Sequence, residues 1–235
     1  MNSFSFKPVG ITHSPYTERF GIPRQSGLVT SAQGSIELFA DPHSGIADGL
    51  EAFSHIWLIF VFDQNPADQW KPKVRPPRLG GNEKVGVFAS RSPYRPNPIG
   101  MSLVKYAGRS IKKGKLHLLI EELDLANGTR ILDIKPHLPY ADSREDSFAQ
   151  WAPEAPQPLL EVKFTHAALQ QLQQHADAYP ELETMIEQTI SFDPRPAYQK
   201  DDPERIYGIC LYTLNIQWIT EKNRATIINI AEKTR

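Results

Sequence analysis

The segment with the densest set of chemically useful side chains is residues 85–102, VGVFASRSPYRPNPIGMS. It places two arginines, Arg91 and Arg95, among three prolines, each of which fixes φ and removes conformational freedom. Guanidinium groups held rigid in this way suit the binding of a carboxylate or a phosphate. A stiff connection between strands, with arginines that pair with acids of the same chain, has the same composition. The residues alone leave both interpretations open.

These arginines belong to a longer basic stretch. Between Lys71 and Lys115 the chain has 12 Lys and Arg and one acid, Glu83, whereas the rest has 14 bases and 26 acids. The net charge of the whole chain is only −1, so the excess of positive charge is local. An excess of this size predicts a surface for a polyanion such as RNA. A solvated basic face balanced by acidic neighbours is the alternative.

The elements that must position these residues are mostly strands. Short segments bounded by Gly, Pro, Asn or Asp predict strands over the first 135 residues. The expected strands are Phe6–Thr12, Gly34–Phe39, Ile56–Phe62, Lys84–Ala89, Met101–Tyr106, Lys115–Glu121 and Arg130–Lys135. Ile56–Phe62 is continuously apolar, which predicts a strand covered on both faces. Many short strands joined by turns predict a mainly β fold, either a barrel or a sandwich.

A change of composition divides the chain into domains. Residues 141–159 are rich in Asp, Ser, Ala and Pro, which predicts a linker or long loop. We therefore expect a first domain over residues 1–140 and a second, small α+β domain over residues 160–235.

Within the second domain the pattern predicts a strand over Leu160–Phe164, followed by two helices. Thr165 is the expected N-cap of the first helix, with Leu169 and Leu172 on its apolar face, and Pro180 fits the first turn of the second. The chain is then expected to end in a hairpin of two strands, Tyr207–Thr220 and Thr226–Ala231, with its turn at Glu221–Arg224.

Several protein classes are excluded. The chain lacks G-x-G-x-x-G, G-x-x-x-x-G-K-[ST] and G-x-S-x-G, which argues against dinucleotide binding, Walker-type nucleotide hydrolysis and an esterase elbow. The single cysteine, Cys210, excludes a disulfide framework, and the histidines show no metal-ligand spacing, so we expect no metal. With neither a signal peptide nor an apolar segment of the ~20 residues that a membrane helix needs, we expect a cytoplasmic protein.

The segment FASRSPYRPNPIGMS resembles the signature of the TsaA-like family, the tRNA N6-threonylcarbamoyladenosine methyltransferases. Other segments are similar to that family in the same order: GITHSPYTERFGIPRQSGLV, LEAFSHIWLIFVFDQN, LDLANGTRILDIKPHLPYAD and DPRPAYQ. The resemblance implies a closed antiparallel β-barrel that binds S-adenosylmethionine, and a homodimer with the cofactor near the subunit interface. It also implies a tRNA substrate that carries threonylcarbamoyl on the adenosine 3′ of the anticodon. No composition or spacing of residues points to this cofactor by itself.

The resemblance further implies a set of cofactor-binding residues: Pro23, Arg24, Gln25, Asp63, Gln64, Arg91, Leu103, Leu123, Asp124, Leu125 and Ala126. A carboxylate at a strand end can accept hydrogen bonds from ribose hydroxyls or from the ammonium group of the methionine part. An arginine can bind its carboxylate. Leu123 and Leu125 could cover the adenine, or could belong to the ordinary core.

The late segment SFDPRPAYQ supplies the candidate catalytic residues, Asp193, Arg195 and Tyr198. On the family match they offer an acceptor, a fixed cation and a stacking ring for a flipped, modified base and its carboxylate. The alternative is a stiff turn. Because N6 of such an adenine is a poor nucleophile, a base would assist methyl transfer; Asp193 and Tyr198 are candidates, although either could only position the substrate.

Two other functions stay open at this point. One is a non-catalytic module in which a basic barrel face binds RNA backbone, and the other is an S-adenosylmethionine sensor that acts through a partner protein. The segment DPRPAYQ favours the enzyme, because a barrel that only binds RNA would not need it. Asp133 and Lys135 could pair with each other or face the site.

Overall fold

The computed structural model describes residues 4–65, 70–80, 82–195, 202 and 204–233, and the chain divides into two compact units. Unit 1 extends to His13 and continues over Gly34–Glu121 and Gly128–Glu154, and unit 2 comprises Ser14–Gln33, Glu122–Asn127 and the chain from Ala155 onward. The segments Ser14–Gln33 and Glu122–Asn127, which we expected in the first domain, therefore group with the C-terminal part of the chain.

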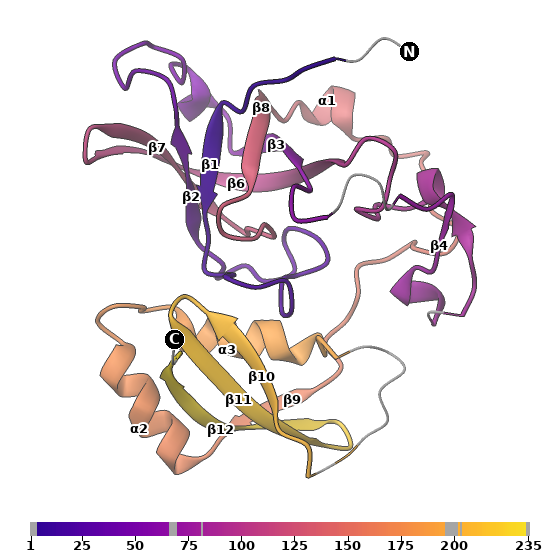
Figure 1. Cartoon of the computed structure of the whole chain (residues 1–235), viewed down its shortest axis with the longest axis vertical. Coiled ribbons are helices and arrows are strands. Elements are labelled where there is room, and N and C mark those ends of the chain that lie inside the picture. The colour runs from indigo at the N-terminus through magenta and orange to yellow at the C-terminus, as the bar shows by residue number, and fades with distance from the viewer. Residues whose placement is uncertain (1–3, 66–69, 81, 196–201, 203, 234–235) are drawn as a thin grey trace. The chain divides into compact units, whose positions relative to one another are not determined.

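Unit 1 is built on a six-stranded antiparallel sheet (Figure 1). Its strands are β1 (Gly10–His13), β2 (Gly34–Leu38), β3 (His55–Val61), β6 (Ile99–Lys112), β7 (Lys115–Glu121) and β8 (Arg130–Pro136). They pair in the order β1–β2–β7–β6–β3–β8, and β8 also pairs with β1, where Ile131 lies opposite Gly10. Every strand of the sheet thus has a neighbour on each side. The prediction of a mainly β protein is confirmed.

Shorter elements connect these strands. They are 3-10 helices at Leu50–Ala52, Pro77–Leu79 and Val87–Ala89, the strand pair β4 (Lys73–Val74) and β5 (Val85–Gly86), and helix α1 (Pro139–Asp142). The strand expected over Lys84–Ala89 is therefore mostly wrong, because after two residues of β5 the chain coils into a 3-10 helix.

The segment expected as a short strand, Met101–Tyr106, is only part of the 14-residue β6. This strand ends in a two-residue turn in which Lys113 and Gly114 both have positive φ, 50° and 74°. That conformation matches the twist of a tight hairpin and leads directly into β7.

The apolar run of β3 shows how the core of unit 1 forms. Alternate residues such as Leu58 are fully buried, while the residues between them, such as Ile59, face outward and are half-buried. Met101, opposite Ile59 on β6, is 47% exposed. The outer face of this strand pair, which we expected to be covered, is thus only partly covered within one chain. On the inner side a Cβ at Gly100 would lie 2.3 Å from Cζ of Phe60, so the close packing requires glycine there.

Unit 2 has a four-stranded sheet in the order β10–β11–β12–β9. Its elements are β9 (Glu161–Phe164), α2 (His166–His175), α3 (Leu182–Ser191), β10 (Tyr207–Leu211), β11 (Leu214–Glu221) and β12 (Arg224–Glu232). Strand β9 runs parallel to β12, and the other pairs are antiparallel. Where we expected one long strand from Tyr207, a turn at Tyr212, with φ of 57°, separates β10 from β11.

The helices of unit 2 pack against this sheet with small and branched side chains. The hydroxyl of Thr165 accepts a hydrogen bond from the backbone N–H of Ala168 at 3.2 Å, which confirms the predicted N-cap of α2. Ala168 and Leu172 face the core, whereas Leu169, expected on the same face, is 38% exposed. Trp218 of β11 is completely buried within this core.

Candidate active site

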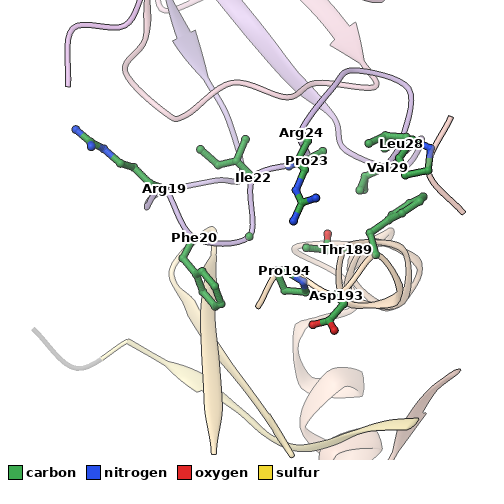
Figure 2. Close-up of a pocket in the computed structure, with 13 residues that line it drawn as sticks. Arg19, Phe20, Ile22, Pro23, Arg24, Leu28, Val29, Thr189, Asp193 and Pro194 are labelled. Atoms are coloured by element: carbon green, nitrogen blue, oxygen red, sulfur yellow. The ribbon is translucent and has the colours of Figure 1, made fainter. Parts of the chain in front are cut away.

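A cavity of about 140 Å³ lies within unit 2, between the loop of residues 19–29 and the C-terminal end of α3. Its lining residues are Arg19, Phe20, Gly21, Ile22, Pro23, Arg24, Leu28, Val29, Pro156, Thr189, Phe192, Asp193 and Pro194. Figure 2 shows the side chain of Arg24 extending from the loop toward the end of α3. Two residues expected to bind the cofactor, Pro23 and Arg24, thus line the same cavity as Asp193, which we expected to be catalytic.

Hydrogen bonds fix the loop that forms one wall of this cavity. The side-chain carbonyl of Gln188, on α3, accepts from the backbone N–H of Ser31 at 3.0 Å and from its hydroxyl at 2.8 Å. The amide group of Gln188 donates to the hydroxyl of Thr30 at 2.9 Å. Nearer the cavity, the hydroxyl of Ser26 donates to the carbonyl of Glu122 at 2.8 Å. These contacts fix the part of the loop that follows Arg24.

Asp193 and Arg195 form a bidentate ion pair. Nε of Arg195 donates to Oδ1 of Asp193 at 2.7 Å, and Nη2 donates to Oδ2 at 2.8 Å. The side chain of Arg195 is 7% exposed and that of Asp193 is 21% exposed. Asp193 has a φ of 49°, a left-handed conformation that aspartate tolerates better than most residues. Each oxygen of this carboxylate already accepts a charge-assisted hydrogen bond, which favours a positioning role. Tyr198 lies outside the described residues.

An aromatic stack packs against Arg195 of this ion pair. The guanidinium carbon of Arg195 lies 5.4 Å from the ring centre of Tyr207. Tyr207 stacks on Trp218 at 5.6 Å between ring centres, and Trp218 stacks on Phe20 at 6.4 Å. Because Phe20 lines the cavity, the stack connects one cavity wall with the residues that hold Asp193.

The segment 123–126 groups with unit 2. Leu123 and Leu125 are 0% and 3% exposed, and neither lines the cavity, so in this structure both contribute to the core. Asp124 and Ala126 are half-buried. Burial raises the pKa of the neighbouring Tyr16 phenol, and the charge of Asp124 adds to this rise.

The other residues expected to bind the cofactor belong to unit 1. Asp63 is exposed at the end of β3, where its Oδ2 lies 3.6 Å from Nε of Arg130, and Gln64 beside it is also exposed. Arg91 is exposed, and Leu103 is half-buried on the outer face of β6, opposite Trp57. The expected cofactor residues are therefore divided between the two units, with Pro23, Arg24 and Gln25 in unit 2.

The proline-rich loop that carries Arg91 is held by its second arginine. Nη1 of Arg95 donates to the carbonyl of Ser90 at 3.2 Å and to that of Ser92 at 3.4 Å. Arg95 thus stabilises the loop from within, while Arg91 remains exposed. The sequence left the roles of Asp133 and Lys135 open. In the structure, Nζ of Lys135 lies 2.8 Å from Oδ2 of Asp133, so the two residues form an ion pair with each other.

The basic stretch does not form one continuous surface. Its middle is neutralised, because Lys105 pairs with Glu121 at 2.7 Å and Arg109 pairs with Asp48 at 2.8 Å. Apart from Arg91, the exposed cations that remain fall into two groups along the chain. The hairpin patch consists of Lys112, Lys113 and Lys115, and the β4–β5 patch consists of Lys71, Lys73, Arg75, Arg78 and Lys84.

The two patches lie on opposite sides of unit 1, with the β6–β7 turn at the left of Figure 1 and β4 at the right. The 14 residues of β6 separate them, and at ~3.3 Å per residue such a strand is roughly 45 Å long. Each patch is therefore a separate candidate for contact with RNA.

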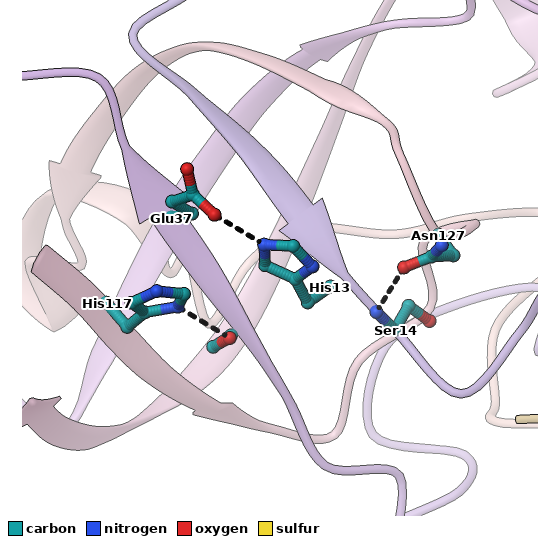
Figure 3. Close-up of polar contacts among 6 residues, drawn as sticks. His13, Ser14, Glu37, His117 and Asn127 are labelled. Carbon is teal, nitrogen blue, oxygen red and sulfur yellow. Dashed lines mark hydrogen bonds and ion pairs between the residues drawn. The ribbon is translucent and has the colours of Figure 1, made fainter. Parts of the chain in front are cut away.

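Sequence patterns gave no indication of a polar cluster on β1, β2 and β7 (Figure 3). Nε2 of His13 lies 2.9 Å from Oε2 of Glu37, and Nδ1 of His117 lies 3.3 Å from Oγ of Ser35. The hydrogen bond with His13 holds the pKa of Glu37 below its usual value, and burial lowers the pKa of His117. The spacing of Ser35 and Glu37 could have indicated that these two side chains lie together, because alternate residues of a strand share a face.

Metal and membrane sites receive no support from the parts of the chain that the structure describes. There, His, Cys, Asp and Glu side chains nowhere form a group of three or more that could hold a metal ion. No helix in those parts has the length and apolar character to cross a membrane.

Comparisons with known proteins match both parts of the chain. The family model of the tRNA-methyltransferase O N-terminal domain matches residues 11–143, and that of the TrmO C-terminal domain matches residues 157–233. The chain is 46% identical to the tRNA (adenine(37)-N6)-methyltransferase of Escherichia coli, over 93% of this chain and 94% of that protein.

A second relative, from Pseudomonas aeruginosa, is 43% identical over 91% of both chains and is classed by its name with the S-adenosylmethionine-dependent methyltransferases. The crystal structure of TrmO from P. aeruginosa is similar at a TM-score of 0.81 and 32% identity, covering 99% of each chain.

Proposed function

This chain belongs to the tRNA-methyltransferase O family, and we propose that it is an enzyme that transfers the methyl group of S-adenosylmethionine to tRNA. The proposed acceptor is N6 of the adenosine next to the anticodon, on a tRNA that already carries threonylcarbamoyl there. The names of the E. coli and P. aeruginosa relatives support the acceptor and the methyl donor. The observation that carries the proposal is the cavity of unit 2, which Arg24 and Asp193 both line.

The cavity residues fit one part of the cofactor. Arg24 offers a guanidinium group to the methionine carboxylate, and Pro23 and Val29 offer apolar surface to the adenine. A volume of about 140 Å³ is smaller than the roughly 300–1,000 Å³ of most ligand pockets, so this cavity accommodates only part of the cofactor. On the resemblance alone, we keep Asp63, Gln64, Arg91 and Leu103 as further cofactor-binding residues. The bound cofactor supplies an electrophilic methyl group on a sulfonium ion.

The protein then has to align the acceptor and receive its proton. Arg195 holds the carboxylate of Asp193 in one orientation at the cavity wall, where it can accept a hydrogen bond from an N–H or O–H of the threonyl part and fix the modified base. Since both oxygens of Asp193 are engaged, we place the removal of the N6 proton with Tyr198, on the strength of the resemblance. In this proposal Asp193 orients the acceptor and Tyr198 takes its proton.

Methylation of tRNA by the purified chain tests this function. Mass spectrometry of nucleosides should find a methyl group on threonylcarbamoyladenosine after incubation with S-adenosylmethionine, and none on a matched tRNA without threonylcarbamoyl. Asp193→Asn and Tyr198→Phe should lower the saturated rate with near-normal tRNA affinity, because contacts made in the transition state act on kcat. Binding of tRNA and cofactor without any methylation would instead favour a binding module or a sensor.

We also propose the finer architecture that the resemblance implied, a closed antiparallel β-barrel and a homodimer acting in the cytoplasm. The pairing of β1 with both β2 and β8 supports the barrel. The half-covered outer face of β3 and β6, with Met101 47% exposed, supports an interface between copies.

Light scattering tests the homodimer. Wild type should be a dimer, and Met101→Lys should shift it toward the monomer. The matched Ile111→Lys, at an exposed residue of β6 near the β6–β7 turn, should not have this effect. A wild-type mass of 26.6 kDa would contradict the dimer.

A further inference from the structure

The ion pair of Asp193 engages the cation that was expected to bind the carboxylate of the substrate. The modified base carries the carboxylate of its threonyl part, and Arg195 was the cation expected to bind it. However, Arg195 is 7% exposed and directs two donors at Asp193, at 2.7 and 2.8 Å. To bind a second carboxylate it would have to release the first, and leaving a buried charge without its partner is strongly unfavourable.

Another arginine lies beside the same aromatic ring. The guanidinium carbon of Arg205 is 5.3 Å from the ring centre of Tyr207, compared with 5.4 Å for Arg195. Unlike Arg195, Arg205 is exposed, and none of the ion pairs found among the described residues includes it. Because it is exposed, its guanidinium group can be reached by a ligand that approaches Tyr207.

Backbone hydrogen bonds and an aromatic ring limit the freedom of Arg205. Its backbone N–H donates to the carbonyl of Asp202 at 3.2 Å, and the carboxylate of Asp202 accepts from the N–H of Glu204 at 3.1 Å. The ring of Tyr207 is itself fixed by stacking on Trp218. A guanidinium group held against an aromatic face loses little freedom when it binds a carboxylate.

We propose that Arg205, rather than Arg195, binds the carboxylate of the threonylcarbamoyl group and so selects modified over unmodified tRNA. This inference rests on the proposed function, which supplies the identity of the substrate. The pair of Asp193 and Arg195 is then a neutral, preformed support for the base, and Arg205 is the charged contact that reads its side chain. A bidentate guanidinium–carboxylate contact suits this task because it needs both charge and planar geometry.

Binding experiments with a matched pair of RNAs test the proposal. One anticodon-loop RNA carries threonylcarbamoyladenosine, and the other carries its methyl ester, which lacks only the negative charge. Wild type should bind the acid about 10- to 100-fold more tightly than the ester, the range expected for one hydrogen-bonded charge. Arg205→Ala should bind the two equally, and Arg205→Lys should keep part of the preference, since it keeps the charge and loses the fork.

Arg224→Ala is the matched control, because it also removes one exposed arginine charge from unit 2 and should keep the full preference. Arg205 is exposed, so its variants should unfold at the wild-type temperature. An Arg205→Ala variant that still prefers the acid would overturn the proposal, and so would a wild type that does not distinguish the two RNAs.

This measurement is independent of methyl transfer, because it needs no cofactor. If wild type prefers the acid through Arg205 but methylates no tRNA, the proposed function fails and the contact stands. If wild type methylates acid and ester forms alike, the proposed function stands and the role of Arg205 is wrong.

Discussion

Unit 1 and unit 2 hold their candidate functional residues in different physical settings. In unit 1, Arg91 and the cations of the hairpin and β4–β5 patches lie at the surface, in loops and at the ends of strands. In unit 2, Asp193 and Arg195 are packed against Tyr207, which stacks on the fully buried Trp218. Substitutions of these surface cations should therefore change binding and leave the fold intact, whereas substitutions of Asp193 and Arg195 should change function and stability together.

The largest effect in this comparison is expected for Arg195→Ala. Removing a buried guanidinium leaves the carboxylate of Asp193 without its partner, which should lower the free energy of unfolding by roughly 3 kcal/mol. Urea denaturation followed by circular dichroism measures this loss. In contrast, Arg224→Ala, which breaks an exposed pair with Glu161, should cost less than about 1 kcal/mol.

A double-mutant cycle separates the ion pair from the loss of packing. If the pair carries the effect, Asp193→Ala combined with Arg195→Ala should be less destabilising than the sum of the two single changes. Additive losses would show that Arg195 acts mainly through its contact with Tyr207.

The next effect concerns binding of the cofactor. Arg24→Ala in unit 2 and Arg91→Ala in unit 1 should each weaken binding of S-adenosylmethionine roughly 10- to 100-fold, because each removes a charge-assisted contact. Calorimetry measures the affinity, with Lys112→Ala as an exposed-lysine control that should bind normally. Wild-type affinity in Arg91→Ala would remove that residue from the site, and wild-type affinity in Arg24→Ala would mean that the cavity of unit 2 binds something else.

A smaller effect distinguishes the two basic patches of unit 1. Neutralising the hairpin patch with Lys112→Gln and Lys113→Gln should raise the dissociation constant for tRNA. It should also reduce the slope of the logarithm of tRNA affinity against the logarithm of salt concentration by roughly one unit per charge removed. The saturated rate of methylation should change little. The matched pair Lys73→Gln and Arg75→Gln tests the β4–β5 patch. Filter binding over a salt series gives both slopes, and a wild-type slope for both double variants would contradict an RNA surface on either patch.

The sequence predicted the fold of unit 1 well where local signals agree with tertiary structure. Lys115–Glu121 was predicted with its observed bounds, because its pattern, turn and neighbours all indicate a strand. The prediction of a strand over Lys84–Ala89 was mostly wrong, because apolar composition does not distinguish a strand from a 3-10 helix. The separation of the basic stretch into two patches could not be foreseen either, since it depends on the length of β6 and on the partners of Lys105 and Arg109.

The candidate site was less predictable because it depends on contacts between distant segments. The resemblance named Pro23, Arg24 and Asp193 separately, and only the structure brings them to one cavity. Arg195 pairs with Asp193, and this pairing likewise depends on side-chain geometry that the spacing of residues in DPRP does not reveal. Arg205 carried no signal at all, because a lone arginine before a strand is ordinary until the ring beneath it is known.

The smallest effect is a dependence of stability on pH at the polar cluster of unit 1. Burial lowers the pKa of His117, with Glu37 opposing this shift and His13 and Lys112 adding to it. Below an unfolded-state pKa of about 6.5 the unfolded chain therefore binds more protons at this site than the folded chain, so stability is lost as pH falls through that value. The variant His117→Gln should show a flatter decline between about pH 7 and 5 in urea denaturation. The lowered pKa of Glu37 acts in a separate window, below about pH 4.3. Identical slopes for wild type and His117→Gln from neutral to mildly acid pH would mean that His117 titrates alike in both states, and that this cluster, unlike the ion pair of unit 2, is not coupled to folding.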